Sequence, residues 1–242
     1  MLQYEVEPDM LSVKDLSKRF GALHALDLVS LEVSRNTIAG VIGPNGAGKT
    51  TLLLGMAGLL PMDAGTLSWE GKPIPAIERS RVFFYVEDAV RPHAQLQVGF
   101  VLHVYACIFR HARSVTERIV ERLRLQDFMR TRVSDLSKGT AKRFLIAVGL
   151  LSTQPVLMLD EPFDGLDLKQ MLEIVPLLRE IAVAGRTLVL SIHQLRDAER
   201  ACDQFVLLSS GRVAGQGTLG ELQARARCEQ CSGLEEVFLR LV

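Results

Sequence analysis

Apolar residues recur along the chain with two different spacings, and each spacing predicts a different element. Positions 13–16 and 28–33 place apolar residues close to alternation, which predicts strands of a small antiparallel sheet. The runs 156–159 and 187–191 are continuously apolar, as in strands buried on both faces of a parallel sheet. A further short run at 37–42 predicts another strand. Together these runs predict an α/β chain.

Helical spacing fills two of the intervals around these strands. The pattern over 50–60 predicts a helix that stops at Pro61, because proline cannot continue the hydrogen-bond ladder. The pattern over 168–184 predicts a longer helix with Gly185 as its C-terminal cap. Pro176 lies inside this second pattern and argues against a straight helix.

The stretch 88–151 differs from the rest of the chain, because helical spacing dominates it. The residues from Ser114 to Glu117 fit a capping box, which predicts the start of a helix. Apolar residues from Ala141 to Leu151 mark one face of another helix. The α/β pattern then returns and ends with a strand and tight turn from Phe205. We therefore expect one domain, 1–242, with an α/β core over 1–87 and 152–242 and an inserted helical subdomain over 88–151.

Composition excludes several classes of protein. The 28 basic residues balance 28 acidic ones, so the chain lacks the positive charge of a nucleic-acid binder, and we expect no nucleic-acid partner. The first ten residues contain no apolar run that would suit a signal peptide. The longest apolar stretches are far shorter than the roughly 20 residues that cross a bilayer. We expect a cytoplasmic protein.

The four cysteines do not form the pattern of a disulfide framework. Cys228 and Cys231 make a single CxxC, which suits half a zinc site or a redox pair. No second pair and no histidine lies nearby in the sequence, so two incidental thiols are the favoured interpretation.

Residues 43–50 read Gly-Pro-Asn-Gly-Ala-Gly-Lys-Thr and fit the pattern GxxxxGK[ST] completely. Glycines let backbone N–H groups surround a phosphate, and the loop opens a helix whose N-terminus favours anions. The ammonium of Lys49 suits the β- and γ-phosphates of ATP, and the Thr50 hydroxyl suits the Mg²⁺ shell. The expected ATP-binding residues of this loop are Gly43, Pro44, Asn45, Gly46, Ala47, Gly48, Lys49, Thr50 and Thr51.

A second acidic motif follows the apolar run at 156–159. Asp160 at the end of this expected strand is a candidate Mg²⁺ ligand. Glu161 is a candidate general base that polarises the attacking water. Strand-end acids are often only solvated, but behind a complete phosphate loop this pair predicts a P-loop nucleotide hydrolase.

The order of these motifs resembles the nucleotide-binding domain of ABC transporters, and the resemblance covers nearly the whole chain. In that family a signature loop reaches across a dimer to the partner's γ-phosphate. Residues 136–140, Leu-Ser-Lys-Gly-Thr, occupy its place. Ser137 and Gly139 match the usual LSGGQ, whereas Lys138 and Thr140 depart from it. Taken alone, this segment is also a common helix N-cap turn.

The resemblance implies roles for four further positions. His193 matches the switch histidine that contacts the γ-phosphate, and Phe20 matches the aromatic residue that stacks on adenine, although Phe20 also suits a core position. Residues 165–167, Gly-Leu-Asp, match the loop that couples the two active sites, with Asp164 in place of serine or asparagine. Glu87 stands where the family has a glutamine that touches Mg²⁺ and senses the membrane partner.

The resemblance therefore implies an ATP-hydrolysing subunit of a transporter. Its cofactors are ATP and Mg²⁺, with Thr50, Glu87 and Asp160 at the metal and Lys49, Glu161 and His193 in catalysis. Its partners are a second ATPase subunit, in the first instance an identical copy, and a polytopic membrane permease that holds it at the inner face of the membrane. The LSKG form and the C-terminal segment 234–239 favour an exporter. The alternatives are an ABC ATPase that acts on ribosomes or DNA, and a non-catalytic nucleotide-binding regulator.

Overall fold

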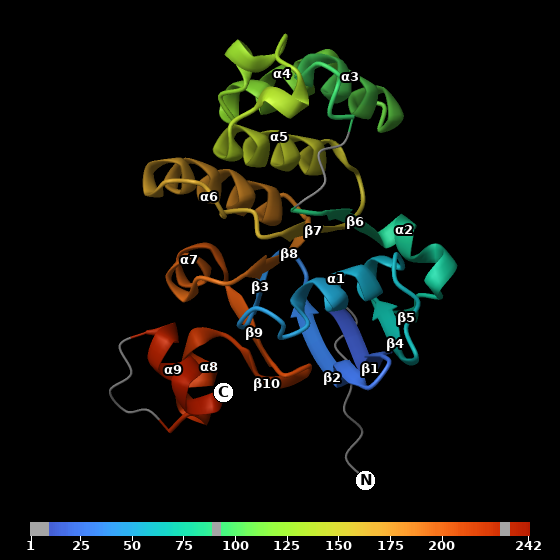
Figure 1. Cartoon of the computed structure of the whole chain (residues 1–242), viewed down its shortest axis with the longest axis vertical. Coiled ribbons are helices and arrows are strands. Elements are labelled where there is room, and N and C mark those ends of the chain that lie inside the picture. The colour runs from blue at the N-terminus through green and yellow to red at the C-terminus, as the bar shows by residue number, and fades with distance from the viewer. Residues whose placement is uncertain (1–9, 89–92, 228–232) are drawn as a thin grey trace.

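The computed structural model describes residues 10–88, 93–227 and 233–242, so the predicted Cys228–Cys231 motif lies outside the described residues. Two sheets and a set of covering helices make up the described chain (Figure 1). The larger sheet has six strands, of which β10 alone runs antiparallel to its neighbour. In sheet order these strands are β10 (Arg212–Gly217), β9 (Gln204–Ser209), β3 (Ile38–Ile42), β8 (Thr187–Ile192), β7 (Val156–Asp160) and β6 (Phe83–Val86).

The central strands of the larger sheet are buried on both faces, as their sequences predict. Every residue of β3, β7 and β8 is buried. Alternate residues of β3 pack into two different hydrophobic clusters, with Ile38 and Ile42 on one face and Ala39 and Val41 on the other. The α/β class and the parallel sheet are thus confirmed.

A smaller sheet covers the second of these clusters. It is antiparallel, in the order β2 (Leu23–Ser34), β1 (Met10–Phe20), β4 (Ala64–Trp69) and β5 (Lys72–Pro73). The alternating runs at 13–16 and 28–33 fall within β1 and β2, as predicted, and every second residue from Val29 to Val33 is buried. The apolar faces of this sheet and of α1 (Lys49–Ala57) share one cluster with the six-stranded sheet.

The helix after the phosphate loop ends earlier than its sequence pattern predicts. We expected Pro61 to stop it, but α1 stops at Ala57, and Gly58 follows in the left-handed conformation with φ 77°. The amide groups of Leu59 and Leu60 both reach back to the carbonyl of Leu54. Glycine takes this conformation without a Cβ clash, so the chain turns three residues before the proline can act.

Helices of the middle segment lie at one end of the molecule (Figure 1). The capping box predicted from Ser114 to Glu117 is wrong: α4 begins at Arg113 after Ala112, with no side-chain cap, and Glu117 instead pairs with Arg113. The predicted face from Ala141 to Leu151 is confirmed within a longer helix. The helices here are α3 (Val98–Ile108), α4 (Arg113–Arg122) and α5 (Lys138–Leu151), with short 3₁₀ turns at Gln126–Phe128 and Val133–Asp135.

Most of the remaining helices lie between or after the strands of the larger sheet, and the last two end the chain. The predicted long helix is α6, which continues through Pro176, and Gly185 follows it in the left-handed region with φ 111°. The strand and turn from Phe205 form the hairpin of β9 and β10. These helices are α6 (Leu168–Val183), α7 (Leu195–Ala201), α8 (Leu219–Arg225) and α9 (Leu234–Leu241), and a short α2 (Arg79–Val82) follows a 3₁₀ turn at Ala76–Glu78. Among the described residues, no helix is long and apolar enough to span a bilayer.

The helical segment shares its core with the sheet. Residues of α3, α4 and α5 belong to the same hydrophobic cluster as Leu157, Leu159 and Leu188 of the strands. A Cβ on Gly149 of α5 would contact Leu157 and Leu159 at 3.1 and 3.3 Å, so helix and sheet pack closely. The predicted subdomain boundaries at 88 and 151 therefore stay a prediction.

Truncation of Phe144 should destabilise the protein through this shared core. Phe144 lies in α5, is fully buried, and is the largest of the fully buried side chains. We expect Phe144→Ala to lower the free energy of unfolding by about 3 to 5 kcal/mol, because burial is lost and a cavity remains. Urea unfolding measures this change. Phe100→Ala removes the same group from a position that is 54% exposed, and an equal loss in both variants would contradict the prediction.

Candidate functional site

The phosphate loop connects β3 to α1 and bends through two left-handed glycines. Gly46 and Gly48 have φ values of 81° and 104°. A Cβ on Gly48 would lie 2.5 Å from the Ala25 carbonyl oxygen, and one on Gly43 would overlap the Leu208 carbonyl. Side chains are thus excluded by conformation and by space, and the backbone itself lines the curve of the loop.

The side chain of Lys49 folds back inside this curve. Lys49 is only 6% exposed. Its ammonium donates to the carbonyl oxygens of Gly43 at 2.8 Å and Pro44 at 3.3 Å, and lies 3.7 Å from a carboxylate oxygen of Glu161. The cation therefore sits between the loop backbone and the end of β7.

Asp160, the last residue of β7, accepts hydrogen bonds from three hydroxyl groups. Thr50 Oγ1 and Tyr85 Oη donate to its Oδ2 at 3.0 and 2.9 Å, and Ser191 Oγ donates to its Oδ1. These donors come from α1, β6 and β8, so the site joins the helix to three adjacent strands. Burial and the adjacent Asp160 carboxylate raise the pKa of Tyr85, which keeps this hydroxyl a donor.

Tyr85 and Ser191 were not identified from the sequence. Ser191 lies opposite Asp160 in the parallel register of β7 and β8. Only the order of strands in the sheet reveals this pairing. The available signal for both residues was a hydroxyl near the C-terminal end of a predicted strand, and such residues are common in any α/β chain.

Glu161 is held at both ends of its backbone. Its N–H donates to Ser191 Oγ at 2.9 Å and to the Ser191 carbonyl at 3.2 Å. Its own carbonyl accepts from Lys142 Nζ at 2.6 Å. The residue has φ 49°, which a residue with a Cβ seldom adopts. Its carboxylate Oε2 pairs with Nδ1 of His193, so the structure brings these two predicted residues together.

A cavity of about 510 Å³ opens above the phosphate loop. Phe20 borders it and is 49% exposed, so the alternative of a core phenylalanine is wrong. Lys18 lies over the Phe20 ring at 5.5 Å. Of the predicted loop residues, Gly43, Pro44 and Ala47 do not line the cavity. Its lining includes Phe20, Leu23, His24, Asn45, Gly46, Gly48, Lys49, Thr50, Thr51 and Glu161.

Ser137 and Gly139 do not line this cavity within one chain. Ser137 caps α5 by accepting from the Thr140 amide at 3.3 Å, and its hydroxyl also bonds that of Thr140 at 2.8 Å. A Cβ on Gly139 would lie 3.2 Å from the Gly165 carbonyl. The N-cap interpretation of the segment is thus correct as far as local structure goes, and Thr140, a departure from the family pattern, completes the cap.

Two of the other departures from the family pattern, Lys138 and Asp164, pair with each other. Lys138 pairs with Asp164 at 2.7 Å. This contact lowers the pKa of the Asp164 carboxyl, chiefly through the hydrogen bond from Lys138. The opposite charges of these two atypical residues, one in the signature segment and one in the loop after β7, therefore offset each other.

Glu87 lies at the junction of two hollows. One is a small cavity that it shares with Lys142, Asp160 and Pro162. The other is an apolar cleft of about 170 Å³ that it shares with Leu59, Phe84, Tyr105, Leu145 and Val148. Glu87 is thus near Asp160 on one side and a largely apolar surface on the other.

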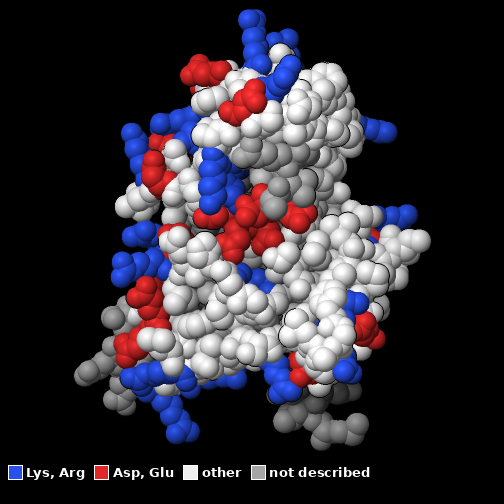
Figure 2. All heavy atoms as spheres, in the orientation of Figure 1, with Lys and Arg blue, Asp and Glu red and all other residues white. Residues whose placement is uncertain are grey.

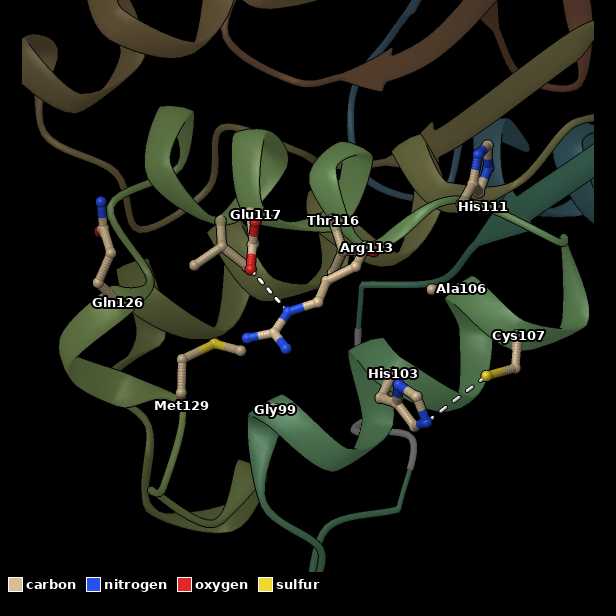
Figure 3. Close-up of a pocket in the computed structure, with 11 residues that line it drawn as sticks. Gly99, His103, Ala106, Cys107, His111, Arg113, Thr116, Glu117, Gln126 and Met129 are labelled. Carbon is tan, nitrogen blue, oxygen red and sulfur yellow. Dashed lines mark hydrogen bonds and ion pairs between the residues drawn. The ribbon is translucent and has the colours of Figure 1, made fainter.

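A separate cavity of about 510 Å³ lies between α3 and α4 (Figure 3). The His103 ring contacts Cys107 Sγ at 3.5 Å on α3, and Arg113 pairs with Glu117 at 2.7 Å one turn later on α4. This cavity shares no lining residue with the one above the phosphate loop. The described residues contain no group of three side chains that would hold a metal ion.

Figure 2 shows Asp and Glu side chains gathered in the centre of one face, with Lys and Arg at their border. A phosphate loop at the end of β3, and a buried carboxylate at the end of β7, define a P-loop nucleotide hydrolase.

Comparison with known proteins narrows this class. The ABC transporter family profile matches residues 26–164. The daunorubicin resistance ATP-binding protein DrrA3 of Streptomyces coeruleorubidus is 34% identical over 88% of this chain and 70% of its own length. A Nod factor export ATP-binding protein I of Ralstonia nicotianae is 35% identical over 88% of this chain and 68% of its own length. A solved ATP-binding subunit of an ABC transporter superposes with a TM-score of 0.85 at 30% identity, over 96% of this chain and 99% of its own.

The chain belongs to the ABC transporter family, as an ATP-binding subunit with ATPase activity. Subunits of this family bind ATP and work with membrane permeases.

Proposed function

We propose that this subunit hydrolyses ATP at the end of β7 to power an exporter, and that two copies close around the nucleotide. The observation that carries the proposal is the convergence of Lys49, Glu161 and His193 beside the phosphate-loop cavity. Lys49 would neutralise phosphate charge, while the paired Glu161 and His193 would orient and deprotonate the attacking water. Phe20, half exposed at the cavity edge, would stack on adenine.

The residues at Asp160 suit Mg²⁺. Thr50 Oγ1 and Asp160 Oδ2 are 3.0 Å apart, and both are oxygen atoms of the kind that Mg²⁺ takes as ligands. Bound with ATP, the cation would neutralise charge on the phosphates. Asp160 would hold it, directly or through water, and the Tyr85 and Ser191 hydroxyls would keep the carboxylate in place. Removal of Mg²⁺ with EDTA should abolish hydrolysis.

The distance of the signature segment from the cavity supports dimerisation. Ser137 and Gly139 match the family motif, yet neither lines the cavity of its own chain. A second copy would supply them to complete the site. The N-terminus of α5, where Ser137 lies, favours an anion such as the γ-phosphate.

The apolar cleft beside Glu87 supports contact with a permease. Leu59 at its edge is 65% exposed, and Phe84 and Tyr105 line it. A membrane subunit that fills this cleft would act on Glu87, which also borders the Asp160 cavity. We infer a location at the cytoplasmic face of the membrane. The names of the daunorubicin resistance and Nod factor export relatives favour outward transport.

Co-expression tests the transport role. The chain is expressed with a polytopic membrane protein encoded by a neighbouring reading frame. We expect the ATPase chain to move to the membrane fraction and its hydrolysis rate to rise. A Leu59→Asp variant should stay unbound while retaining its basal ATPase rate. Equal membrane binding and equal stimulation of hydrolysis in the wild type and in Leu59→Asp would contradict the docking proposal.

Replacement of Glu87 by the glutamine usual in the family tests its proposed metal role. A neutral amide binds Mg²⁺ more weakly than a carboxylate but also repels the γ-phosphate less. We expect Glu87→Gln to need severalfold more Mg²⁺ for half-maximal hydrolysis while the maximal rate largely survives. Titration of the ATPase rate with Mg²⁺ measures this. Glu121→Gln, on the exposed face of α4, serves as the control. Unchanged Mg²⁺ dependence and rate would count against the proposed role.

A further inference from the structure

Lys142 is a buried lysine at the acidic end of the sheet. It lies one turn after the start of α5, and only 4% of it is exposed. Its ammonium pairs with the Asp88 carboxylate and donates to the Glu161 carbonyl at 2.6 Å. Lys142 also lines a small cavity together with Glu87 and Asp160. Lys142 thus connects the start of α5 to the segment after β6 and to the backbone of Glu161.

The free-energy cost of burying the Lys142 ammonium requires that it be paired and hydrogen-bonded. An ammonium ion removed from water is strongly destabilising unless it is paired and hydrogen-bonded. Lys142 satisfies this condition through two partners that come from separate parts of the chain. The segment 87–88 carries two adjacent acids beside Asp160 and Glu161, and Lys142 supplies a positive charge that offsets them. The positive charge of Lys142 therefore offsets part of the negative charge of these acids.

Glu161 is the residue on which this contact acts. Its left-handed backbone persists only when the surroundings hold it. Ser191 holds its N–H, while Lys142 Nζ and the Asp164 amide, at 3.2 Å, both donate to its carbonyl. Fixing both peptide groups fixes the direction of the side chain, which meets His193.

We propose that Lys142 is a positioning residue for hydrolysis: it holds Glu161 in its reactive orientation and couples that orientation to the start of α5 and to the segment 87–88. This inference rests on the proposed role of Glu161 as general base. Because α5 begins at the signature segment, movement of that segment would reach the Glu161 carbonyl through the Lys142 side chain.

Lys142→Met removes the charge and the donor at similar side-chain length. We expect the kcat for ATP hydrolysis to fall roughly 10- to 100-fold, a range typical of residues that orient catalytic groups, while the Kd for ATP stays nearly unchanged. Hydrogen–deuterium exchange of the nucleotide-free chain should accelerate over residues 160–166. Lys142→Arg should recover much of the rate. Lys72→Met, at an exposed lysine of β5, is the control.

A double variant separates positioning from simple ion pairing. Lys142→Met with Asp88→Asn leaves neither charge unpaired, so it should recover thermal stability without recovering kcat, because the Glu161 carbonyl has still lost the Lys142 donor. If the single variant fails to fold, the double variant provides the same kinetic comparison. Full recovery of kcat in the double variant would overturn the proposal. So would wild-type kcat in Lys142→Met, or a loss of ATP affinity equal to the loss of rate.

Glu161→Gln distinguishes failure of this inference from failure of the proposed function. If Glu161→Gln retains turnover, the general-base proposal fails. If Glu161→Gln is inactive while Lys142→Met turns over normally with unchanged exchange, the positioning role alone fails.

Discussion

Lys49→Ala is expected to lose ATP turnover almost completely. The ammonium lies within the phosphate loop, bonded to the carbonyl groups of Gly43 and Pro44 and 3.7 Å from Glu161. Methyl replacement removes the cation that would compensate the β- and γ-phosphates, and no other lysine or arginine borders the cavity among the described residues. Loss of one such electrostatic contact costs on the order of 100-fold or more in rate.

Two measurements distinguish this effect from misfolding. Fluorescent-nucleotide binding should show much weaker affinity, and thermal unfolding without nucleotide should remain cooperative. The stabilisation that ATP gives the wild type should disappear, because stabilisation by a ligand follows its affinity. Lys72→Ala, which removes an exposed lysine outside the site, should match the wild type. Wild-type ATP affinity together with wild-type turnover in Lys49→Ala would contradict the assignment.

Glu161→Gln should separate nucleotide binding from hydrolysis. The amide retains the size of the side chain and can still hydrogen-bond to His193, while the backbone contacts to Ser191 and Lys142 are unaffected. An amide cannot take a proton from water, so we expect kcat to fall roughly 100- to 10,000-fold. The affinity for ATP should persist.

The same variant tests the sandwich dimer. With ATP retained and not hydrolysed, size-exclusion chromatography should show a dimer that disappears when ATP is replaced by ADP. Glu121→Gln, at an exposed acid outside the site, should hydrolyse ATP normally and show no trapped dimer. A monomeric profile of Glu161→Gln with ATP would refute the dimer, and unaltered turnover would refute the role of Glu161.

Much of the fold could be predicted because its signals are local. Continuous apolar runs predicted β3, β7 and β8, and all their residues are buried. Errors came where two local signals competed. Gly58 ends α1 before Pro61, and α4 begins at Arg113 without the expected cap. In both places the helix boundary lies only a few residues from the predicted one.

The candidate site divides in the same way. The phosphate loop, Asp160, Glu161 and His193 could be proposed from the sequence because each lies at the end of a predicted strand or directly after one. The sequence also showed four departures, at Glu87, Lys138, Thr140 and Asp164, without an explanation. The structure pairs two of them, Lys138 and Asp164, which come from different segments of the chain.

The sequence by itself determined the class of this protein, its phosphate loop and the order of its strands along the chain. Only the tertiary structure decided which strands are neighbours, and therefore that Tyr85 and Ser191 meet at Asp160. It also decided that Lys142 reaches Asp88 and Glu161. The physical reason is that periodicity records which face of an element is buried, whereas side-chain pairing between elements depends on long-range packing.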